Sequence, residues 1–399
     1  MRILVVTHNY PRFAGDPAGA FVARLAAETA RAGHEVRVVA PHTPGTALVE
    51  SHDGVCVHRF RYAPERFERV GYRGDLHRRS VLTPLVALGV PLFLGAFAAA
   101  VRRAVRDFAP EVVHAHWWFP SGALAAASGV PYVVTCHGSD VRLLDRSALL
   151  RRLGRRVLRR AAAVTTVSAF LADDLRRVVP ELGERLCVAP MPIDVPLFSS
   201  GLAVPKADPP QILYAGNLIP SKGVADLIRA VAILARRGVA CRLKILGEGP
   251  ALEELRAEAG AAGLDGHHVE WSRFLPQAAM PAQYGASTIT VLPTRGHEEG
   301  LGLTLVEALL AGCAVVGTRA GGIPEVVIDG ETGLLARGGD AGDLAEKLHR
   351  LLADGALRDR LAAQGRRRVE SIYNAASATA RFVDLYDAIA NRRRAPRSA

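Results

Sequence analysis

Residues 297–318 read His-Glu-Glu-Gly-Leu-Gly-Leu-Thr-Leu-Val-Glu-Ala-Leu-Leu-Ala-Gly-Cys-Ala-Val-Val-Gly-Thr. Two glycines, Gly300 and Gly302, disfavour a helix before residue 303. Residues 303–311 are apolar apart from one threonine and one glutamate, which predicts a buried helix, and the glycine that follows is suited to end it. Residues 314–316 are apolar and mostly β-branched, which predicts a buried strand. We therefore expect a loop, a helix and a strand in close succession.

Glu307 is a carboxylate on an otherwise apolar helix, one turn past its start. A buried carboxylate without partners costs several kcal/mol, roughly what would unfold a domain, so Glu307 must face a cleft or accept a hydrogen bond. The helix start also presents free backbone N–H groups, which form an anion site. A carboxylate that binds hydroxyls beside a site that binds phosphate suggests a sugar nucleotide. The alternative is an ordinary buried helix, with Glu299 in the preceding loop and Glu307 bonded to neighbouring backbone.

The composition indicates a globular protein of two or three domains. The chain has 399 residues, of which 49% are hydrophobic and 22% are charged. Its five cysteines are odd in number and scattered, so we expect neither a disulfide framework nor a zinc site, and we expect a reducing compartment. The first apolar run, residues 2–7, is too short for a signal peptide and predicts a strand. These features favour a cytoplasmic protein.

The net charge of +11 is concentrated in the first half of the chain. Residues 1–195 contain 26 Arg and Lys against 17 Asp and Glu, whereas residues 196–399 contain 24 against 22. A positive field of this kind can attract an acidic acceptor, an anionic membrane surface or nucleic acid. Residues 145–161 include arginines at positions 151, 152, 155, 156, 159 and 160, with leucines between them. This pattern predicts a basic amphipathic helix, either solvated or in contact with an anionic bilayer. Nucleic acid is less favoured, because no aromatic residues interleave with this basic run.

The first half alternates strands and helices. A strand at residues 2–7, a helix at 21–32 and a strand at 35–40 form a βαβ unit, which predicts a parallel sheet. The intervening loop contains Gly19, where backbone could approach a ligand phosphate, although its glycine spacing is not that of the dinucleotide fingerprint. Residues 81–101 lack charge and are long enough to span a membrane. Prolines and glycines interrupt them within the α/β pattern, so we expect a buried crossover helix instead.

Two predicted strands of the first half end in side chains suited to ligand binding. Strand 112–116 contains two histidines and leads into an aromatic loop, and strand 132–136 leads into the loop 137–140. Ligands of open α/β sheets bind at the carboxyl ends of the strands, so both loops are candidates for a site. The two histidines of strand 112–116 could form a metal pair, but the sequence suggests no third ligand. Core or cleft histidines are therefore favoured.

The second half repeats the α/β pattern after a proline-rich linker near residues 190–210. A strand at 211–216 leads into a loop that ends at Lys222, just before a helix. Lys222 could bind a phosphate at that helix start or could be an ordinary surface lysine. Further strands are predicted at 241–246, 268–274 and 288–293, and further helices at 341–353, 356–371 and 376–391.

These motifs resemble those of a known family. Glu299 and Glu307, in the frame Glu-x-x-Gly-Leu…Glu-Ala, are similar to the signature of the retaining glycosyltransferases of family 4, which have the GT-B fold. Residues 137–140 resemble the His-Gly-x-Asp loop of that family, and residues 321–335 match its last conserved stretch. The resemblance covers essentially the whole chain, and its motifs are most specific in the second half.

The resemblance implies an α/β fold with two Rossmann-like domains facing across a cleft and a C-terminal helix crossing back to the first domain. The acceptor-binding domain would comprise residues 1–195 with helix 376–391, and the nucleotide-sugar-binding domain residues 205–372. The implied reaction is retaining, metal-independent transfer of a sugar from a nucleoside-diphosphate sugar to a hydroxyl of a glycan, lipid or small molecule. No cofactor is implied. The sequence contains no Asp-x-Asp, the spacing that the other main fold of these enzymes uses to bind a metal ion.

The resemblance also assigns roles to individual residues. The catalytic residues would be His137 and Glu299, which meet the transferred sugar, and Lys222, which stabilises the departing diphosphate. Glu307 would bind the ribose hydroxyls. The other donor-binding residues would be Gly302, Leu303, Asn217, Gly216, Gly247, Glu248 and Gly19. The acceptor would meet Trp117, Trp118 and Asp140.

One position departs from the family pattern. Asn217 lies where the family has an arginine that binds the diphosphate together with the lysine. Either Lys222 and backbone N–H groups must then do more, or another arginine such as Arg295 supplies the missing charge. The departure also leaves open a relative without turnover that only binds a nucleotide sugar.

The sequence is also compatible with three functions other than a transferase. They are an epimerase or phosphorylase of the same fold, a non-catalytic binding relative, and a nucleic-acid binder that uses the basic first half. We rank them in that order, and we do not expect nucleic acid as a partner. A basic helix near residues 145–161 adds the expectation of a peripheral location at the inner face of the membrane. The sequence leaves the base, the sugar and the acceptor undetermined.

Overall fold

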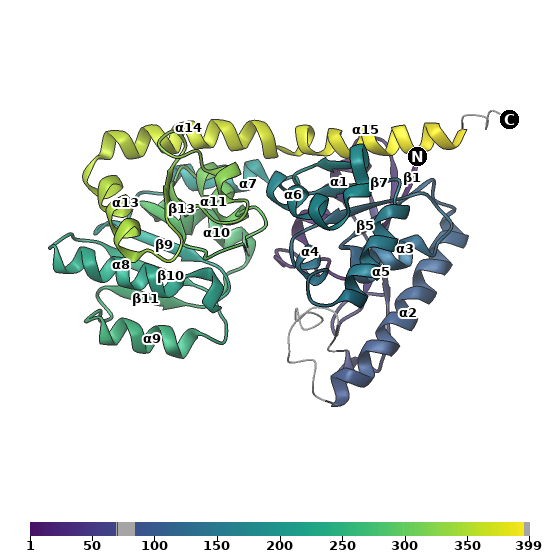
Figure 1. Cartoon of the computed structure of the whole chain (residues 1–399), viewed down its shortest axis with the longest axis horizontal. Helices are drawn as coiled ribbons and strands as arrows, with labels where there is room; N and C mark the ends of the chain where they lie inside the picture. The colour runs from purple at the N-terminus through teal and green to yellow at the C-terminus, as the bar shows by residue number, and fades with distance from the viewer. Residues whose placement is uncertain (69, 71–83, 298, 395–399) are drawn as a thin grey trace. The chain divides into compact units, whose positions relative to one another are not determined.

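The computed structural model describes residues 1–68, 70, 84–297 and 299–394 (Figure 1). The chain divides into two compact units. The first comprises Met1–Pro192 together with the C-terminal residues from Ala375, and the second comprises Ile193–Asn374. Each unit has a parallel β-sheet covered by helices, so the predicted α/β fold with two Rossmann-like domains is confirmed.

In the described part of the first unit, eight strands form one sheet in the order β3-β4-β2-β1-β5-β6-β7-β8. All neighbouring pairs are parallel except β3 and β4, which are antiparallel. The inner strands β5 and β6 are buried at every residue, because helices cover both sides of the sheet. The strands are β1 Arg2–Val6, β2 Glu35–Pro41, β3 Val49–His52, β4 Val55–Phe60, β5 Val112–His116, β6 Tyr132–Cys136, β7 Ala163–Thr166 and β8 Leu186–Val188.

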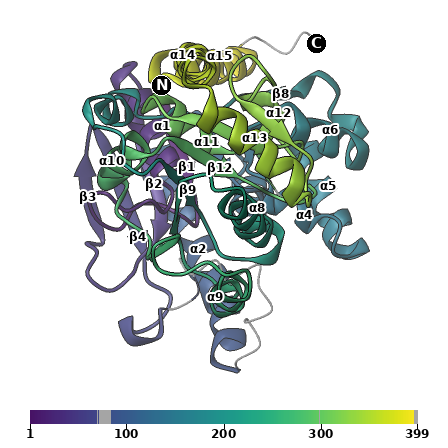
Figure 2. The ribbon, with the colours of Figure 1, turned by 90° about the vertical axis from the view of Figure 1, so that its left-hand side faces the viewer.

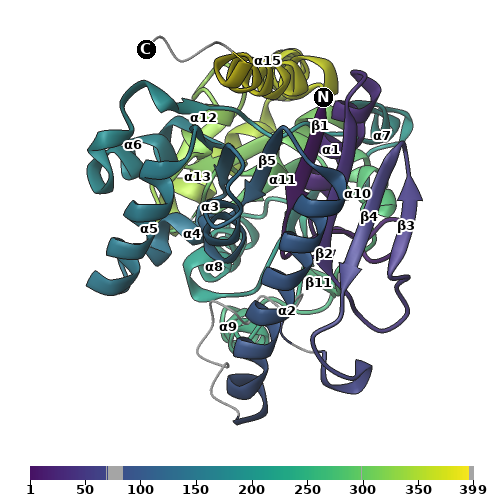
Figure 3. The same ribbon diagram turned by 90° about the vertical axis from the view of Figure 1, so that its right-hand side faces the viewer.

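The helices of this unit include the predicted crossover helix, α2, which spans Pro84–Phe108 and packs across β1 and β2 (Figure 3). Residues 81–83 of the predicted helix lie outside the described residues. None of the helices in the described ranges combines the length and the apolar character needed to cross a membrane. The other helices are α1 Ala20–Arg31, α3 Ala123–Ala126, α4 Ser139–Leu143, α5 Ala148–Arg160, α6 Ala169–Val178 and α15 Ala375–Arg394.

The C-terminal helix α15 belongs to the first unit, as expected. It packs on α1 and contacts β5. The hydroxyl of Tyr386 lies 2.6 Å from Nδ1 of His114, and Phe382 lies against the same imidazole ring. A side chain more than 270 residues away in sequence therefore joins the core of the first unit.

In the second unit, six described strands form a fully parallel sheet in the order β11-β10-β9-β12-β13-β14. Helices α8 and α13 lie side by side on this sheet (Figure 2). The strands are β9 Gln211–Ala215, β10 Arg242–Leu246, β11 Val269–Ser272, β12 Ile289–Leu292, β13 Ala314–Thr318 and β14 Leu334–Ala336. The helices are α7 Val195–Ser199, α8 Val224–Arg236, α9 Leu252–Ala261, α10 Met280–Ala286, α11 Leu303–Leu310, α12 Ile323–Val326, α13 Ala341–Ala353 and α14 Gly355–Tyr373.

Candidate functional site

Helix α11 in the second unit begins where the sequence predicts. Gly302 precedes it with a φ of 93°, a left-handed conformation that glycine adopts without strain. Glu307 lies one turn further on, and its Oε2 accepts a hydrogen bond of 2.8 Å from the hydroxyl of Tyr284 on α10. Burial raises the pKa of Glu307 to about 7, and the Tyr284 hydrogen bond opposes that rise. The carboxylate thus has the side-chain donor that its position requires.

Lys222 and Glu299 form an ion pair, with 2.6 Å between Nζ and Oε2. Lys222 ends the short turn before α8, and Glu299 lies in the loop before α11. Their side chains are only 18% and 16% exposed, so Lys222 is not an ordinary surface lysine. A Cβ on Gly302 would lie 3.9 Å from Cγ of Glu299, which places this pair beside the start of α11. The fold therefore brings an ammonium group, a carboxylate and a helix N-terminus together.

Two glycines fix the backbone of Glu299. The N–H of Gly322 donates to the carbonyl of Glu299 at 2.9 Å. Gly321 has a φ of 54°, and a Cβ there would lie 2.1 Å from the same carbonyl oxygen. A Cβ on Gly322 would lie 2.3 Å from the carbonyl oxygen of Gly300. Sequence reasoning noted this glycine pair only through the family resemblance, yet it determines where Glu299 lies.

The other predicted donor-binding residues lie on two loops that touch. A Cβ on Gly247 would lie 2.0 Å from the carbonyl oxygen of Gly216, so both loops approach through their backbones. Asn217 is exposed, and its carbonyl accepts a hydrogen bond of 2.8 Å from Tyr214. The carboxylate of Glu248 is half-exposed and lies 3.5 Å from the guanidinium of Arg273. Leu303 is the first residue of α11.

Arg295 lies next to the Lys222 loop, because its N–H donates to the carbonyl of Ser221 at 2.8 Å. Its guanidinium is engaged elsewhere. Nε and Nη2 donate to the two carboxylate oxygens of Asp226 at 2.6 and 2.5 Å. Asp226 also lies 3.5 Å from Arg229. The nearby arginine that could replace the missing family arginine is therefore committed to a bidentate ion pair in this conformation.

The predicted residues of the first unit gather around His137. Its ring packs against Trp117 at 4.5 Å and against Phe21 of α1 at 4.9 Å, measured between ring centroids. Its Nε2 lies 3.1 Å from Nδ1 of His116. Burial lowers the pKa of His137 to about 3, so the imidazole is neutral near pH 7. Sequence reasoning missed Phe21, which only the packing of α1 brings to this histidine.

Gly19 precedes α1 with a φ of 69°. A Cβ at this position would lie 2.3 Å from the carbonyl oxygen of Asn9, so only glycine allows the loop to close here. This helix start is two residues from Phe21 and so belongs to the same cluster as His137.

Asp140 and Trp118 shape the loop that positions His137. Oδ1 of Asp140 accepts hydrogen bonds from the N–H groups of His137 and Gly138 at 3.0 and 3.1 Å. Its Oδ2 accepts from the N–H of Trp118 at 3.2 Å, and the Trp118 indole donates to the Asp140 carbonyl at 2.6 Å. The two side chains are 0% and 1% exposed, and Trp117 is 7% exposed. The structure thus gives Asp140 and Trp118 a positioning role, and acceptor contact by these residues stays a prediction.

The two histidines of β5 are core residues. Both are completely buried. Nδ1 of His114 bonds to Tyr386, and its Nε2 bonds to Thr135, each at 2.6 Å. Within the ranges that the structure describes, no cluster of His, Cys, Asp or Glu side chains has the arrangement of a metal site.

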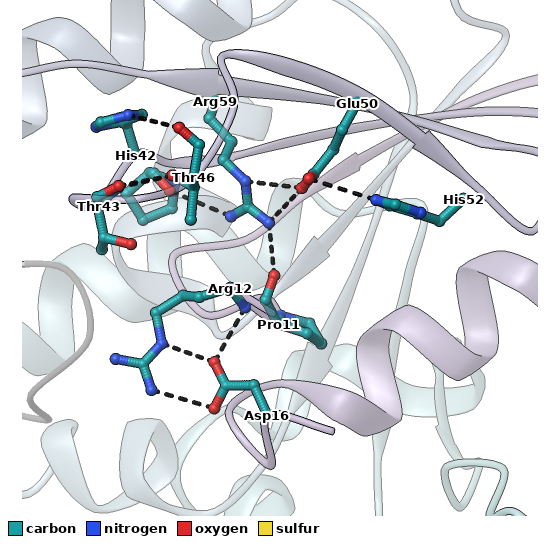
Figure 4. A network of polar contacts seen from close by, with 10 residues as sticks. Pro11, Arg12, Asp16, His42, Thr43, Thr46, Glu50, His52 and Arg59 are labelled. Carbon is teal, nitrogen blue, oxygen red and sulfur yellow. Dashed lines mark hydrogen bonds and ion pairs between the residues drawn. The ribbon is translucent and has the colours of Figure 1, made fainter. Parts of the chain in front are cut away.

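A polar network that sequence reasoning missed fixes the loop before Gly19 (Figure 4). Arg12 donates to both carboxylate oxygens of Asp16, at 2.6 and 3.1 Å. Arg59, 5% exposed on β4, donates to the carbonyl of Pro11 at 2.5 Å and to the Glu50 carboxylate at 2.6 Å. The loop is therefore tied to the edge of the sheet through buried charges.

Comparison with known proteins identifies the family. Residues 203–368 match the family model described as "Glycosyl transferases group 1", and residues 18–196 match that of "Glycosyltransferase Family 4". The chain is 30% identical over 394 residues to a glycogen synthase from Mycobacterium tuberculosis, covering 94% of this chain and 91% of the relative. The chain belongs to the group 1 glycosyltransferases. It is therefore an enzyme that transfers a glycosyl group.

Another relative and a solved structure also align with most of the chain. A GDP-mannose-dependent alpha-(1-6)-phosphatidylinositol monomannoside mannosyltransferase from Mycolicibacterium smegmatis is 29% identical, over 88% of this chain and 89% of its own. Among solved structures, the sucrose-phosphate synthase from Thermosynechococcus elongatus aligns with a TM-score of 0.77 at 24% identity, covering 98% of this chain and all of that one. This similarity confirms the predicted GT-B fold.

Proposed function

We propose that this glycosyltransferase is retaining and metal-independent, and that it moves a sugar from a nucleoside-diphosphate sugar to a hydroxyl group of a glycan, a lipid or a small molecule. One observation carries the proposal. The ammonium of Lys222 and the carboxylate of Glu299 lie 2.6 Å apart beside the start of α11. The Lys222 ammonium and the start of α11 can bind the negatively charged diphosphate of the donor, and the Glu299 carboxylate can accept hydrogen bonds from the hydroxyls of its sugar.

The departing diphosphate is the part of the donor that develops negative charge. Lys222 and the N–H groups of Gly302 and Leu303 at the start of α11 supply positive charge without a metal ion, and preorganised donors of this kind lower the barrier for charge development. When a diphosphate binds, the ammonium exchanges its carboxylate partner for phosphate oxygens. Glu299 is then released to accept hydrogen bonds from hydroxyls of the sugar.

The remaining roles follow the same chemistry. Glu307 accepts hydrogen bonds from the ribose hydroxyls. His137, which is neutral near pH 7, offers the sugar a hydrogen bond without adding charge to the site. In a retaining reaction of this type a donor phosphate oxygen takes the acceptor proton, so no protein base is required. Asn217 lacks the positive charge of the arginine that the family has at this position. Lys222 and the α11 amides supply this charge in its place, because Arg295 is paired with Asp226.

The class of donor is supported by relatives, since the Mycolicibacterium smegmatis mannosyltransferase is named as GDP-mannose-dependent. The test is a thermal-shift panel with UDP-glucose, GDP-mannose and ADP-glucose. A ligand at a hundred times its Kd stabilises the folded state by about 2.7 kcal/mol. The donor that binds is then incubated with candidate acceptors, and proton NMR reports the anomeric configuration of the product. An inverted product would refute retention, and a panel without any shift would refute the proposed donor class.

We further propose that the protein binds an anionic membrane surface on the cytoplasmic side. The proposal rests on the exposed arginines and leucines of α5. Arg155 and Arg159 both pair with Glu181, and Arg151 lies 3.5 Å from Asp145. These three arginines therefore have counter-charges within the protein.

The neighbouring stripe of α5 is different. Leu149 and Leu153 are 65% and 47% exposed. Arg152, Arg156 and Arg160 are exposed and form no ion pair with any residue that the structure describes. Because these five side chains recur at intervals of three and four residues, they form one stripe along the helix. Exposed leucines between unpaired arginines are typical of a helix that lies on an anionic bilayer.

Liposome flotation tests this part separately. Replacing Arg152, Arg156 and Arg160 by Ser should abolish binding to vesicles that contain phosphatidylglycerol. The matched control replaces Arg151, Arg155 and Arg159 by Ser, removes the same charge, and should weaken binding much less. Equal losses would mean that only net charge matters. If the unaltered protein does not float, the membrane proposal fails while the transferase proposal stands.

A further inference from the structure

We infer that Tyr284 is a positioning residue, which orients the carboxylate of Glu307 for the ribose hydroxyls of the donor. This inference rests on the proposed function. Its basis is the hydrogen bond of 2.8 Å from the Tyr284 hydroxyl on α10 to Oε2 of Glu307 on α11. Tyr284 is 1% exposed, so its hydroxyl cannot turn to water as an alternative partner.

The packing of α10 leaves the Tyr284 ring little freedom to move. A Cβ on Gly285 would lie 2.2 Å from the carbonyl oxygen of Gly201, so the backbone of α10 is in contact with residues 200–203. The ring of Phe198 lies 6.2 Å from that of Tyr284, measured between centroids. A phenol held in this way is a fixed donor. Burial also raises its pKa well above the usual value, so it remains protonated.

A fixed donor has two effects on Glu307. First, it selects one orientation of the carboxylate. Each carboxylate oxygen can accept two hydrogen bonds. With Tyr284 bound, Oε2 can accept one more and Oε1 can accept two, and these positions are available to the two neighbouring hydroxyls of the ribose. Second, the hydrogen bond favours the charged carboxylate, which burial disfavours. Removing the hydroxyl should therefore misorient Glu307 and leave more of it protonated near neutral pH, where a protonated acid is the poorer acceptor.

The test measures nucleoside diphosphate affinity by calorimetry between pH 6 and 9, using whichever of UDP, GDP and ADP binds best. Tyr284→Phe keeps the ring and removes the hydroxyl. We expect about a tenfold loss of affinity at pH 7, the scale of one hydrogen bond to a charged group. The loss should shrink towards pH 9, because both proteins then have an ionised Glu307. The midpoint of the affinity profile should accordingly move to higher pH.

Two controls separate positioning from general damage. Tyr132→Phe removes another buried hydroxyl, one that donates to the Val157 carbonyl in the first unit, and should leave nucleotide affinity unchanged. A 2′,3′-dideoxy nucleotide lacks the hydroxyls that Glu307 binds, so Tyr284→Phe should lower its affinity little or not at all. If Tyr284→Phe does not fold, 3-fluorotyrosine placed at position 284 is the second test. Its more acidic hydroxyl is a stronger donor and should move the midpoint to lower pH.

The outcomes distinguish this inference from the proposed function. If the unaltered protein binds no nucleoside diphosphate, the proposed function fails. If it binds one and Glu307→Gln weakens that binding, but Tyr284→Phe changes neither affinity nor midpoint, only the inference is overturned. An equal loss at every pH, for ribose and dideoxy ligands alike, would also overturn it, since a purely structural defect behaves in this way.

Discussion

Replacing Lys222 by methionine should lower turnover by about a hundredfold or more while leaving the fold intact. The substitution keeps most of the side-chain volume and removes the charge that faces the departing diphosphate. A single donor placed at a developing anion contributes about 2.7–4 kcal/mol to the barrier, which corresponds to about a hundredfold to a thousandfold in rate. The expected loss of turnover is therefore that of one cation missing from the site.

The same substitution has a separate effect on stability. Glu299 is 16% exposed and loses its partner at 2.6 Å. Leaving a mostly buried charged group unpaired costs about 1–3 kcal/mol. For a unit of this size, that corresponds to a fall in Tm of about 2–12 °C. The double variant Lys222→Met with Glu299→Gln leaves neither charge unpaired and should recover most of this stability.

The assay follows release of nucleoside diphosphate from the donor identified by thermal shift, and Tm is measured in parallel. Stability should recover in the double variant, whereas turnover should not, because the cation is still missing. Lys347→Met on α13 is the matched control, since that ammonium lies 3.9 Å from Asp343 in the same unit. Turnover of Lys222→Met within about threefold of the unaltered protein, or recovered turnover in the double variant, would refute the assignment.

Glu307→Ala should weaken nucleoside diphosphate binding in calorimetry and leave the circular dichroism spectrum unchanged; equal affinity would remove the ribose role. Gly321→Ala places a Cβ 2.1 Å from the carbonyl oxygen of Glu299, so it should cost about 1–3 kcal/mol and lower turnover strongly, while Gly260→Ala, with open space around it, should do neither. Asp140→Ala leaves three N–H groups without their acceptor and should lower the unfolding free energy in urea by about 3–5 kcal/mol, whereas the exposed Asp173→Ala should stay within about 0.5 kcal/mol of the unaltered protein.

Much of the fold could be predicted from local patterns. Strands β5 and β6 and helix α13 were expected at the residues where they occur, because continuous apolar runs and helical periodicity are properties of neighbouring residues. The short strands β3, β7 and β14 were not predicted. Each has only three or four residues, and pairing with neighbouring strands, which a local pattern does not reveal, stabilises them.

The same distinction between local patterns and contacts of distant residues applies to the candidate site. From the residues alone it followed that Glu307, the one carboxylate on an apolar helix, must face a cleft or accept a hydrogen bond, because burying a charge without partners is costly in any fold. The folded structure was needed to show that the donor is Tyr284, that Lys222 meets Glu299 across 77 residues of sequence, and which arginines of α5 pair with a carboxylate. Side-chain periodicity is a property of neighbouring residues, whereas contacts between distant residues depend on strand order and helix packing, which no short pattern specifies.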